Sequence, residues 1–185
     1  VIRRAFVEYP DGKLMLRKAE PEGQEFLRSS DFNSRCINTA VGPDGWLYVT
    51  DMYRGIIQDA PWFNEGNREF ARRTGVNKHI QMGRIWRIRH LDHRPYQEKP
   101  QMLTESTEEL VRHLQNPIGW WRDTAQKLIL LRKDREKMIP LLEGLFRFTQ
   151  SPLPRMHALW TLDGMNALTT EIKGEALSAR SPELR

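Results

Sequence analysis

The chain contains a single cysteine, Cys36, among its 185 residues. One cysteine cannot form an intrachain disulfide or a cysteine-rich zinc site. It also cannot attach a c-type haem, which requires two cysteines followed by a histidine. A lone cysteine is usually a small buried hydrophobic residue, and this is the role that we expect here. We therefore predict no cofactor within this chain.

Long apolar runs and dense basic runs are also missing. No stretch approaches the roughly 18 apolar residues that a membrane-spanning helix needs, so we expect no transmembrane segment in this chain. The formal net charge is +5, but basic residues mostly alternate with acidic ones. Nucleic-acid-binding proteins usually gather basic residues in a stripe. The pattern favours a mixed, solvated surface and no nucleic-acid partner.

The start of the chain has neither an initiator methionine nor an apolar signal-peptide core, because it reads Val1-Ile2-Arg3-Arg4. A hydrophobic content of 39% with six tryptophans argues for a folded chain rather than a disordered one. We therefore expect a folded internal piece of a larger protein, which would share its function with the remainder.

Residues 42–55 are the most informative stretch that is present. A Pro-Asp-Gly turn leads into a strand, and the strand ends in a polar loop that carries an arginine. Tyr48 and Thr50 would share one face of the strand and Leu47 and Val49 the other. Propeller blades repeat this order of turn, inner strand and exit loop. A blade needs roughly 40–50 residues and a closed ring at least four blades, so a piece of a propeller is predicted.

Residues 1–95 consist of strands and loops in this interpretation. A hairpin is predicted over 5–17 and another strand over 83–89. A short helix over 67–74 would interrupt the long connection between strands. We predict that residues 1–95 form about two blades from the C-terminal, closing part of a β-propeller.

The pattern changes after a proline-containing linker at residues 96–105. From Ser106 onward the apolar residues recur at helical spacing, and Ser106 with Glu109 fits a capping box that would begin the first helix. The inward-facing residues of the helices would be those spaced three or four apart, and Trp120, Trp121 and Trp160 are expected in the core.

A weak repeat within residues 106–185 involves two Arg–Ala pairs. Arg122 and Ala125 recur 33 positions later as Arg155 and Ala158. This interval is within the range of helical repeats. It predicts an α-helical HEAT-like solenoid over 106–185, with an ordinary helical bundle as the alternative. The predicted fold class is mixed, with β and α in separate segments.

Asp51, Tyr53 and Arg54 leave the central strand together, with Gln58 just beyond. At the mouth of a propeller the arginine could donate in a bidentate manner, the aspartate could accept or act as a base, and the tyrosine could stack. Such a pocket would bind a polyol or a quinone carboxylate. Alternatively, Asp51 and Arg54 pair with each other or cap the loop. Both charged groups are expected to be partly open to solvent.

Histidines offer a weaker candidate. His90 and His93 have a spacing that binds metals when it lies on a helix, but here it follows a predicted strand beside Pro95. No third ligand follows at a fixed spacing, so we predict no metal site.

Five segments in one order resemble a family of large bacterial proteins described as membrane-bound dehydrogenases. In that family a sugar-dehydrogenase-like β-propeller precedes HEAT-like repeats, and many members carry a c-type cytochrome domain. The segments are residues 25–29, 42–58, 83–88, 120–126 and 157–164.

The resemblance implies a fragment of a quinone- or haem-linked oxidoreductase that acts on a sugar or alcohol in the periplasm or cell envelope. Pyrroloquinoline quinone or haem c would be held elsewhere in the full-length protein, so this fragment alone would be inactive. The alternative is a non-catalytic glycan- or protein-binding propeller, with the helical part as a docking scaffold for a protein partner.

Overall fold

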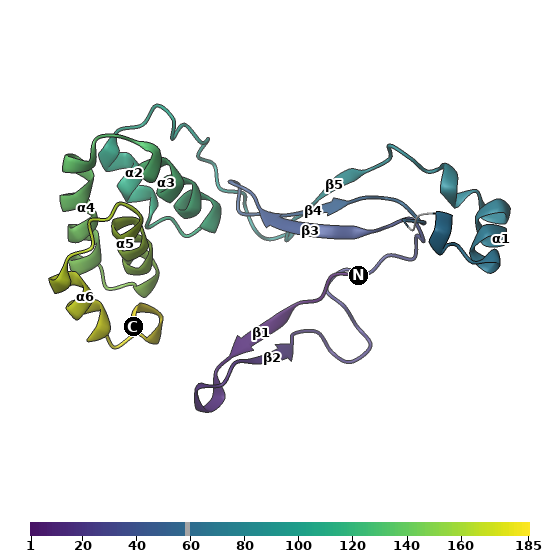
Figure 1. Ribbon diagram of the computed structural model, residues 1–185, viewed down its shortest axis with the longest axis horizontal. Coiled ribbons are helices and arrows are strands. Elements are labelled where there is room, and N and C mark those ends of the chain that lie inside the picture. The colour runs from purple at the N-terminus through teal and green to yellow at the C-terminus, as the bar shows by residue number, and fades with distance from the viewer. Residues whose placement is uncertain (58–59) are drawn as a thin grey trace. The chain divides into compact units, whose positions relative to one another are not determined.

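A computed structural model describes residues 1–57 and 60–185 (Figure 1). The chain divides into two compact units. The strand unit comprises Val1–Ala40 and Leu47–Leu91, and the helical unit comprises Val41–Trp46 and Asp92–Arg185. A short turn from the middle of the strand region is therefore part of the helical unit.

The strands form two small antiparallel sheets, with the orders β1-β2 and β3-β4-β5. Their bounds are β1 Ala5–Glu8, β2 Met15–Lys18, β3 Cys36–Val41, β4 Leu47–Asp51 and β5 Arg84–Ile88. Ala5 lies opposite Lys18 in the first sheet, which confirms the predicted N-terminal hairpin. In the second sheet Asp51, at the end of β4, lies opposite Arg84, at the start of β5.

These sheets do not form part of a propeller, so that prediction was wrong. The larger sheet has three strands, the smaller has two, and neither closes. Propeller blades have four strands and surround a central channel. Alternating residues and Pro-Asp-Gly turns specify antiparallel hairpins, and hairpins occur in open sheets as readily as in blades.

The predicted short helix of the strand unit is confirmed as α1, Glu65–Thr74. The side chain of Asn64 caps its first turn by accepting a hydrogen bond of 2.8 Å from the Asn67 N–H. The helix ends at Gly75, in the left-handed conformation that helix C-termini often require. Phe70 packs on Phe32 with ring centroids 5.0 Å apart, which anchors the helix next to the segment before β3.

The helical unit contains five α-helices among the described residues. They are α2 Thr107–His113, α3 Gly119–Leu131, α4 Arg135–Phe148, α5 Pro152–Gly164 and α6 Thr170–Leu177. Their buried side chains form one apolar core, in which Trp121, Ile129, Leu142 and Leu162 are fully buried. No helix of the described chain is long and apolar enough to cross a bilayer.

The helices do not form a repeat solenoid, which corrects the second part of the predicted fold. The five described helices surround a single core, whereas stacked repeats generally need three or more units for stability. The recurring arginines bind carbonyl oxygens near the end of a preceding helix. Arg122 donates to Asn116 and Pro117, and Arg155 donates to Phe146. The arginine–carbonyl contact therefore occurs twice, although the helices do not form stacked repeats.

The capping box at the start of α2 is present as predicted. The Ser106 hydroxyl accepts from the Glu109 N–H at 3.2 Å, and the Glu109 carboxylate accepts from the Ser106 N–H at 2.8 Å. Loss of such a cap usually costs about 1 kcal/mol. We therefore expect Ser106→Ala to lower the free energy of unfolding of the helical unit by about 1 kcal/mol in denaturant titrations followed by circular dichroism. Equal stability of the variant and the wild type would contradict a contribution from this cap.

The Val41–Trp46 turn makes specific contacts within the helical unit. The Trp121 indole N–H donates to the Pro43 carbonyl at 2.9 Å, and the Tyr96 N–H donates to the Asp44 carbonyl at 3.1 Å. Gly45 has a φ of 81°, and a Cβ atom there would lie 3.2 Å from the Ile118 side chain. Both the conformation and the close approach favour glycine at this position.

Candidate functional site

A cavity of about 370 Å³ lies at the end of β4 in the strand unit. We call it the β4 cavity. It is bounded by the segment before β3, by the end of β4 and by strand β5. Its lining residues are Leu27, Arg28, Ser29, Asp31, Ser34, Cys36, Asp51, Tyr53, Arg84, Trp86, Arg87 and Ile88.

Asp51 forms the polar centre of this region and is only 2% exposed. Its carboxylate accepts hydrogen bonds from the Arg35 N–H at 2.7 Å and from the Trp86 indole N–H at 3.0 Å. The Tyr53 N–H and the Ser34 hydroxyl also donate to it, at 2.8 and 3.4 Å. The expectation that Asp51 would be open to solvent was therefore wrong, because these donors replace the water that it loses.

The same contacts determine the charge of Asp51. Burial alone raises the pKa of its carboxyl group. The four hydrogen bonds favour the ionised form and together outweigh burial, so the pKa lies below the ordinary value. Asp51 is thus an ionised structural acceptor that connects β4, β5 and the segment before β3.

Tyr53 adopts a left-handed backbone conformation, with a φ of 48°. This conformation is uncommon for a residue with a large side chain. Its N–H is held by Asp51. Its hydroxyl group is hydrogen-bonded to Asp31, which raises the pKa of Tyr53 and lowers that of Asp31. Tyr53 therefore stays protonated, and it binds Asp51 through its N–H and Asp31 through its hydroxyl group.

Asp31 is the exposed carboxylate of the β4 cavity. The Asn33 N–H donates to it at 2.9 Å and the Asn33 amide at 3.2 Å. The backbone hydrogen bond from Asn33 is the largest cause of the lowered pKa of Asp31, followed by the bond from Tyr53. Asp31 thus presents an ionised acceptor to the cavity.

Arg84 and Trp86 line the cavity from β5. The Arg84 guanidinium carbon lies 3.6 Å from the centroid of the Tyr53 ring and 5.4 Å from that of Trp86. These cation–π contacts fix the plane of the guanidinium group. Trp86 is 46% exposed although its indole N–H is bound to Asp51. The cavity thus presents an oriented donor group beside an accessible aromatic ring.

The structure brings together only part of the predicted site. Asp51 and Tyr53 line the β4 cavity. Arg54 is exposed, donates to the Ile56 carbonyl of its own loop at 3.1 Å and does not line the cavity. Gln58 lies outside the described residues. Among the described contacts Asp51 and Arg54 do not pair with each other, but both bind the backbone of the loop, which is the other half of that alternative.

The sequence analysis predicted only Asp51 and Tyr53 of the lining residues, and it missed the three on which the candidate site most depends, Asp31, Arg84 and Trp86. Alternation along β5 could have identified two of them, since residues 84 and 86 share a face of the strand. Asp31 carries no comparable signal, because it lies in a loop far from both strands in the sequence.

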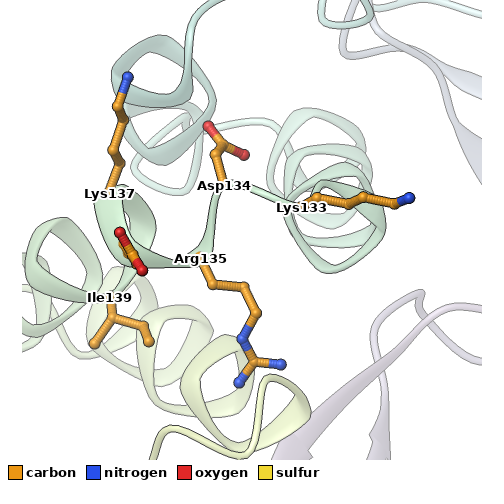
Figure 2. Close-up of a pocket in the computed structure, with 6 residues that line it drawn as sticks. Lys133, Asp134, Arg135, Lys137 and Ile139 are labelled. Atoms are coloured by element: carbon orange, nitrogen blue, oxygen red, sulfur yellow. The ribbon is translucent and has the colours of Figure 1, made fainter.

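A second hollow of about 490 Å³ lies beside the start of α4, in the helical unit (Figure 2). Lys133, Arg135 and Lys137 line it, but Figure 2 shows them extending in different directions. Arg135 donates to the Met165 carbonyl, and Asp134 accepts from the Thr107 hydroxyl. Because these charges do not converge and two of the groups hold the fold together, the β4 cavity is the better candidate site.

Comparison with known proteins finds a match for the strand region alone. No curated protein and no solved structure matches the chain. Residues 1–92 match a family described as a domain of unknown function (DUF7133). All residues that line the β4 cavity fall within this matched region.

Proposed function

We propose that residues 1–92 form a binding module that holds a carbohydrate or polyol in the β4 cavity without turning it over. One observation carries the proposal. The acceptor Asp31, the donor Arg84 and the half-exposed ring of Trp86 line the same cavity. Binding pockets typically combine aromatic surface with a few convergent polar groups in this way.

The chemistry of these groups suits a ligand with many hydroxyl groups. A hydroxyl group both donates and accepts, so it can donate to Asp31 and accept from Arg84. The apolar C–H face of a sugar ring can pack on an exposed indole, which offers a large rigid apolar surface. The described interactions of Arg84 are with two rings, with the Tyr53 hydroxyl and, electrostatically, with the Asp31 carboxylate. This leaves guanidinium N–H groups for a ligand.

Binding is favoured over catalysis by the state of the carboxylates. An efficient general base has a pKa near the working pH. Hydrogen bonds lower the pKa values of both Asp31 and Asp51 below their ordinary range. Asp51 is also buried and accepts four hydrogen bonds. Neither group is suited to remove a proton from an alcohol at neutral pH.

The other expectations from the family resemblance stay predictions. They are an oxidoreductase activity on a sugar or alcohol, pyrroloquinoline quinone or haem c in the full-length protein, and a location in the periplasm or cell envelope. A protein partner on the helices also stays a prediction.

The proposal is tested by titrating the 185-residue chain with a panel of mono- and oligosaccharides, sugar acids and polyols, followed by calorimetry and ligand-observed NMR. We expect Arg84→Ala to weaken binding of the ligand identified by about tenfold or more, because hydrogen bonds to charged groups contribute about 1.5–3 kcal/mol. Arg54→Ala is the matched control, since the hydrogen bond described for its side chain is to its own loop and it does not line the β4 cavity. It should bind as the wild type does.

Three results would contradict the proposal. The panel could show no binding, or Arg84→Ala could bind normally. Alternatively, Arg54→Ala could lose binding, which would favour the set of site residues first predicted from the sequence. Reduction of an artificial electron acceptor by a saccharide with the cofactor-loaded full-length protein would instead support the oxidoreductase.

A further inference from the structure

A second group of polar side chains lies in the helical unit, apart from the β4 cavity. Glu98 and Glu105 precede α2, and His113 is in the last turn of that helix. One potential ligand atom from each residue lies within 4.8 Å of the other two. The group therefore combines one imidazole nitrogen with two carboxylate oxygens.

The position of His113 is fixed by burial. The residue is 5% exposed, and its ring packs on the indole of Trp121 with centroids 4.9 Å apart. Its Nε2 atom lies 2.8 Å from a carboxylate oxygen of Glu105. Because Trp121 is itself fully buried, the imidazole has little freedom to turn away from the glutamates.

Glu98 is exposed but is also oriented by its neighbours. The Tyr96 hydroxyl donates to its carboxylate at 2.7 Å, and the Asn116 amide donates to the Tyr96 oxygen at 3.1 Å. Hydrogen bonds of this kind position the ligands of metal sites and increase the affinity of the site for the metal ion. A simple His–Glu pair would need neither Glu98 nor this chain of donors.

We propose that Glu98, Glu105 and His113 bind a divalent transition-metal ion, and that Zn²⁺ is the best match. Zinc accepts imidazole nitrogen and carboxylate oxygen at about 2.0–2.2 Å, and its open sites use three protein ligands and a water molecule. Ligand atoms around a tetrahedral ion are ~3.4 Å apart. To reach that geometry, the Glu105 carboxylate moves back from its 2.8 Å contact with His113 Nε2, and the exposed Glu98 side chain rotates toward the ion. This site is separate from the His90–His93 pair considered above, and we propose it in place of the expectation that the chain holds no metal.

The test uses the full 185-residue chain after treatment with a chelator, titrated with zinc chloride in a calorimeter. We expect one ion per chain, and we expect Glu98→Gln to weaken binding by about tenfold or more, in line with the effect of perturbing a metal's ligand set. Glutamine still accepts the hydrogen bond from Tyr96, so the fold should persist. Glu108→Gln, an exposed change on α2, is the control and should bind zinc as the wild type does.

A double variant with His90→Asn and His93→Asn excludes the exposed histidines as the zinc ligands. It should keep wild-type affinity. The proposal is overturned if the wild type binds no zinc, if Glu98→Gln binds as tightly as the wild type, or if only the double variant loses binding. Circular dichroism checks each variant's helix content, and Glu105→Gln replaces Glu98→Gln if the latter does not fold.

Discussion

Trp121→Ala is expected to lower the free energy of unfolding of the helical unit by about 3–5 kcal/mol, the usual cost of removing a fully buried large aromatic side chain. Trp121 is 0% exposed and contacts the rings of Tyr96, His113 and Trp120. Its indole N–H also binds the Pro43 carbonyl. Urea titrations followed by far-ultraviolet circular dichroism measure the loss, because the helices of this unit dominate that signal.

Two further variants test whether the lost stability comes from the buried ring or from its hydrogen bond to Pro43, and whether any tryptophan would give the same loss. Trp121→Phe keeps an aromatic ring but removes the donor to Pro43, so it should lose less stability than the alanine variant. Trp160→Ala is the matched control. Trp160 is 60% exposed, and exposed substitutions usually change stability by about 0.5 kcal/mol or less. Equal losses in Trp121→Ala and Trp160→Ala would show that Trp121 does not organise the core.

Asp51→Ala should have the second largest effect and should destabilise the strand unit by about 3 kcal/mol or more. It removes the acceptor for the Arg35 and Tyr53 N–H groups and for the Trp86 indole. Each buried donor left without a partner costs about 1–3 kcal/mol. Tryptophan fluorescence during denaturant unfolding reports the change, since Trp86 is a direct partner of Asp51. Glu69→Gln, an exposed change on α1, should leave stability unaltered.

The lowered pKa of Asp51 also predicts a dependence on pH. A carboxyl group whose pKa is lower in the folded state stabilises the fold fully above its unfolded pKa, which is about 3.9 for aspartate. This contribution is lost as the pH falls through the lower folded pKa. The stability difference between the wild type and Asp51→Ala should therefore shrink below about pH 4. A difference that stays constant down to pH 2 would contradict the direction of this shift.

Local features of the fold followed from the sequence. The hairpin around Pro10 and the capping box of Ser106 and Glu109 depend on neighbouring residues, and both are confirmed. Closure of a propeller and stacking of a solenoid depend on contacts between distant segments. No local pattern specifies those contacts, and both predictions were wrong.

Helix α5 shows how a buried face can be misjudged. Trp160 was expected in the core as an aromatic residue at helical spacing, but it is exposed, and the buried face carries His157, Ala158, Thr161 and Leu162. His157 is tolerated there because Arg122 donates to its Nε2 atom and its Nδ1 atom binds Gln126. Polar residues enter a core when partners from other helices satisfy them, and those partners lie about 30 positions away in the sequence.

The sequence predicted only those residues of the candidate site that are neighbours in the chain. Asp51 and Tyr53 were identified from their position at the end of a strand. Strand pairing with Asp51 places Arg84 at the β4 cavity. The hydrogen bond to the Tyr53 hydroxyl places Asp31 there. Both relations join residues at least 20 positions apart, so a linear pattern does not reveal them.

The Val41–Trp46 turn makes the two units inseparable by any single cut in the polypeptide. A fragment that stops at residue 92 keeps the turn but loses Tyr96 and Trp121, which hold it. A fragment that starts at residue 92 leaves the Trp121 indole N–H without its acceptor. During synthesis, the hydrogen bond between Trp121 and Pro43 can form only after about 80 further residues have been added to the chain. The chain therefore passes between the units three times, at residues 40–41, 46–47 and 91–92, rather than through one linker.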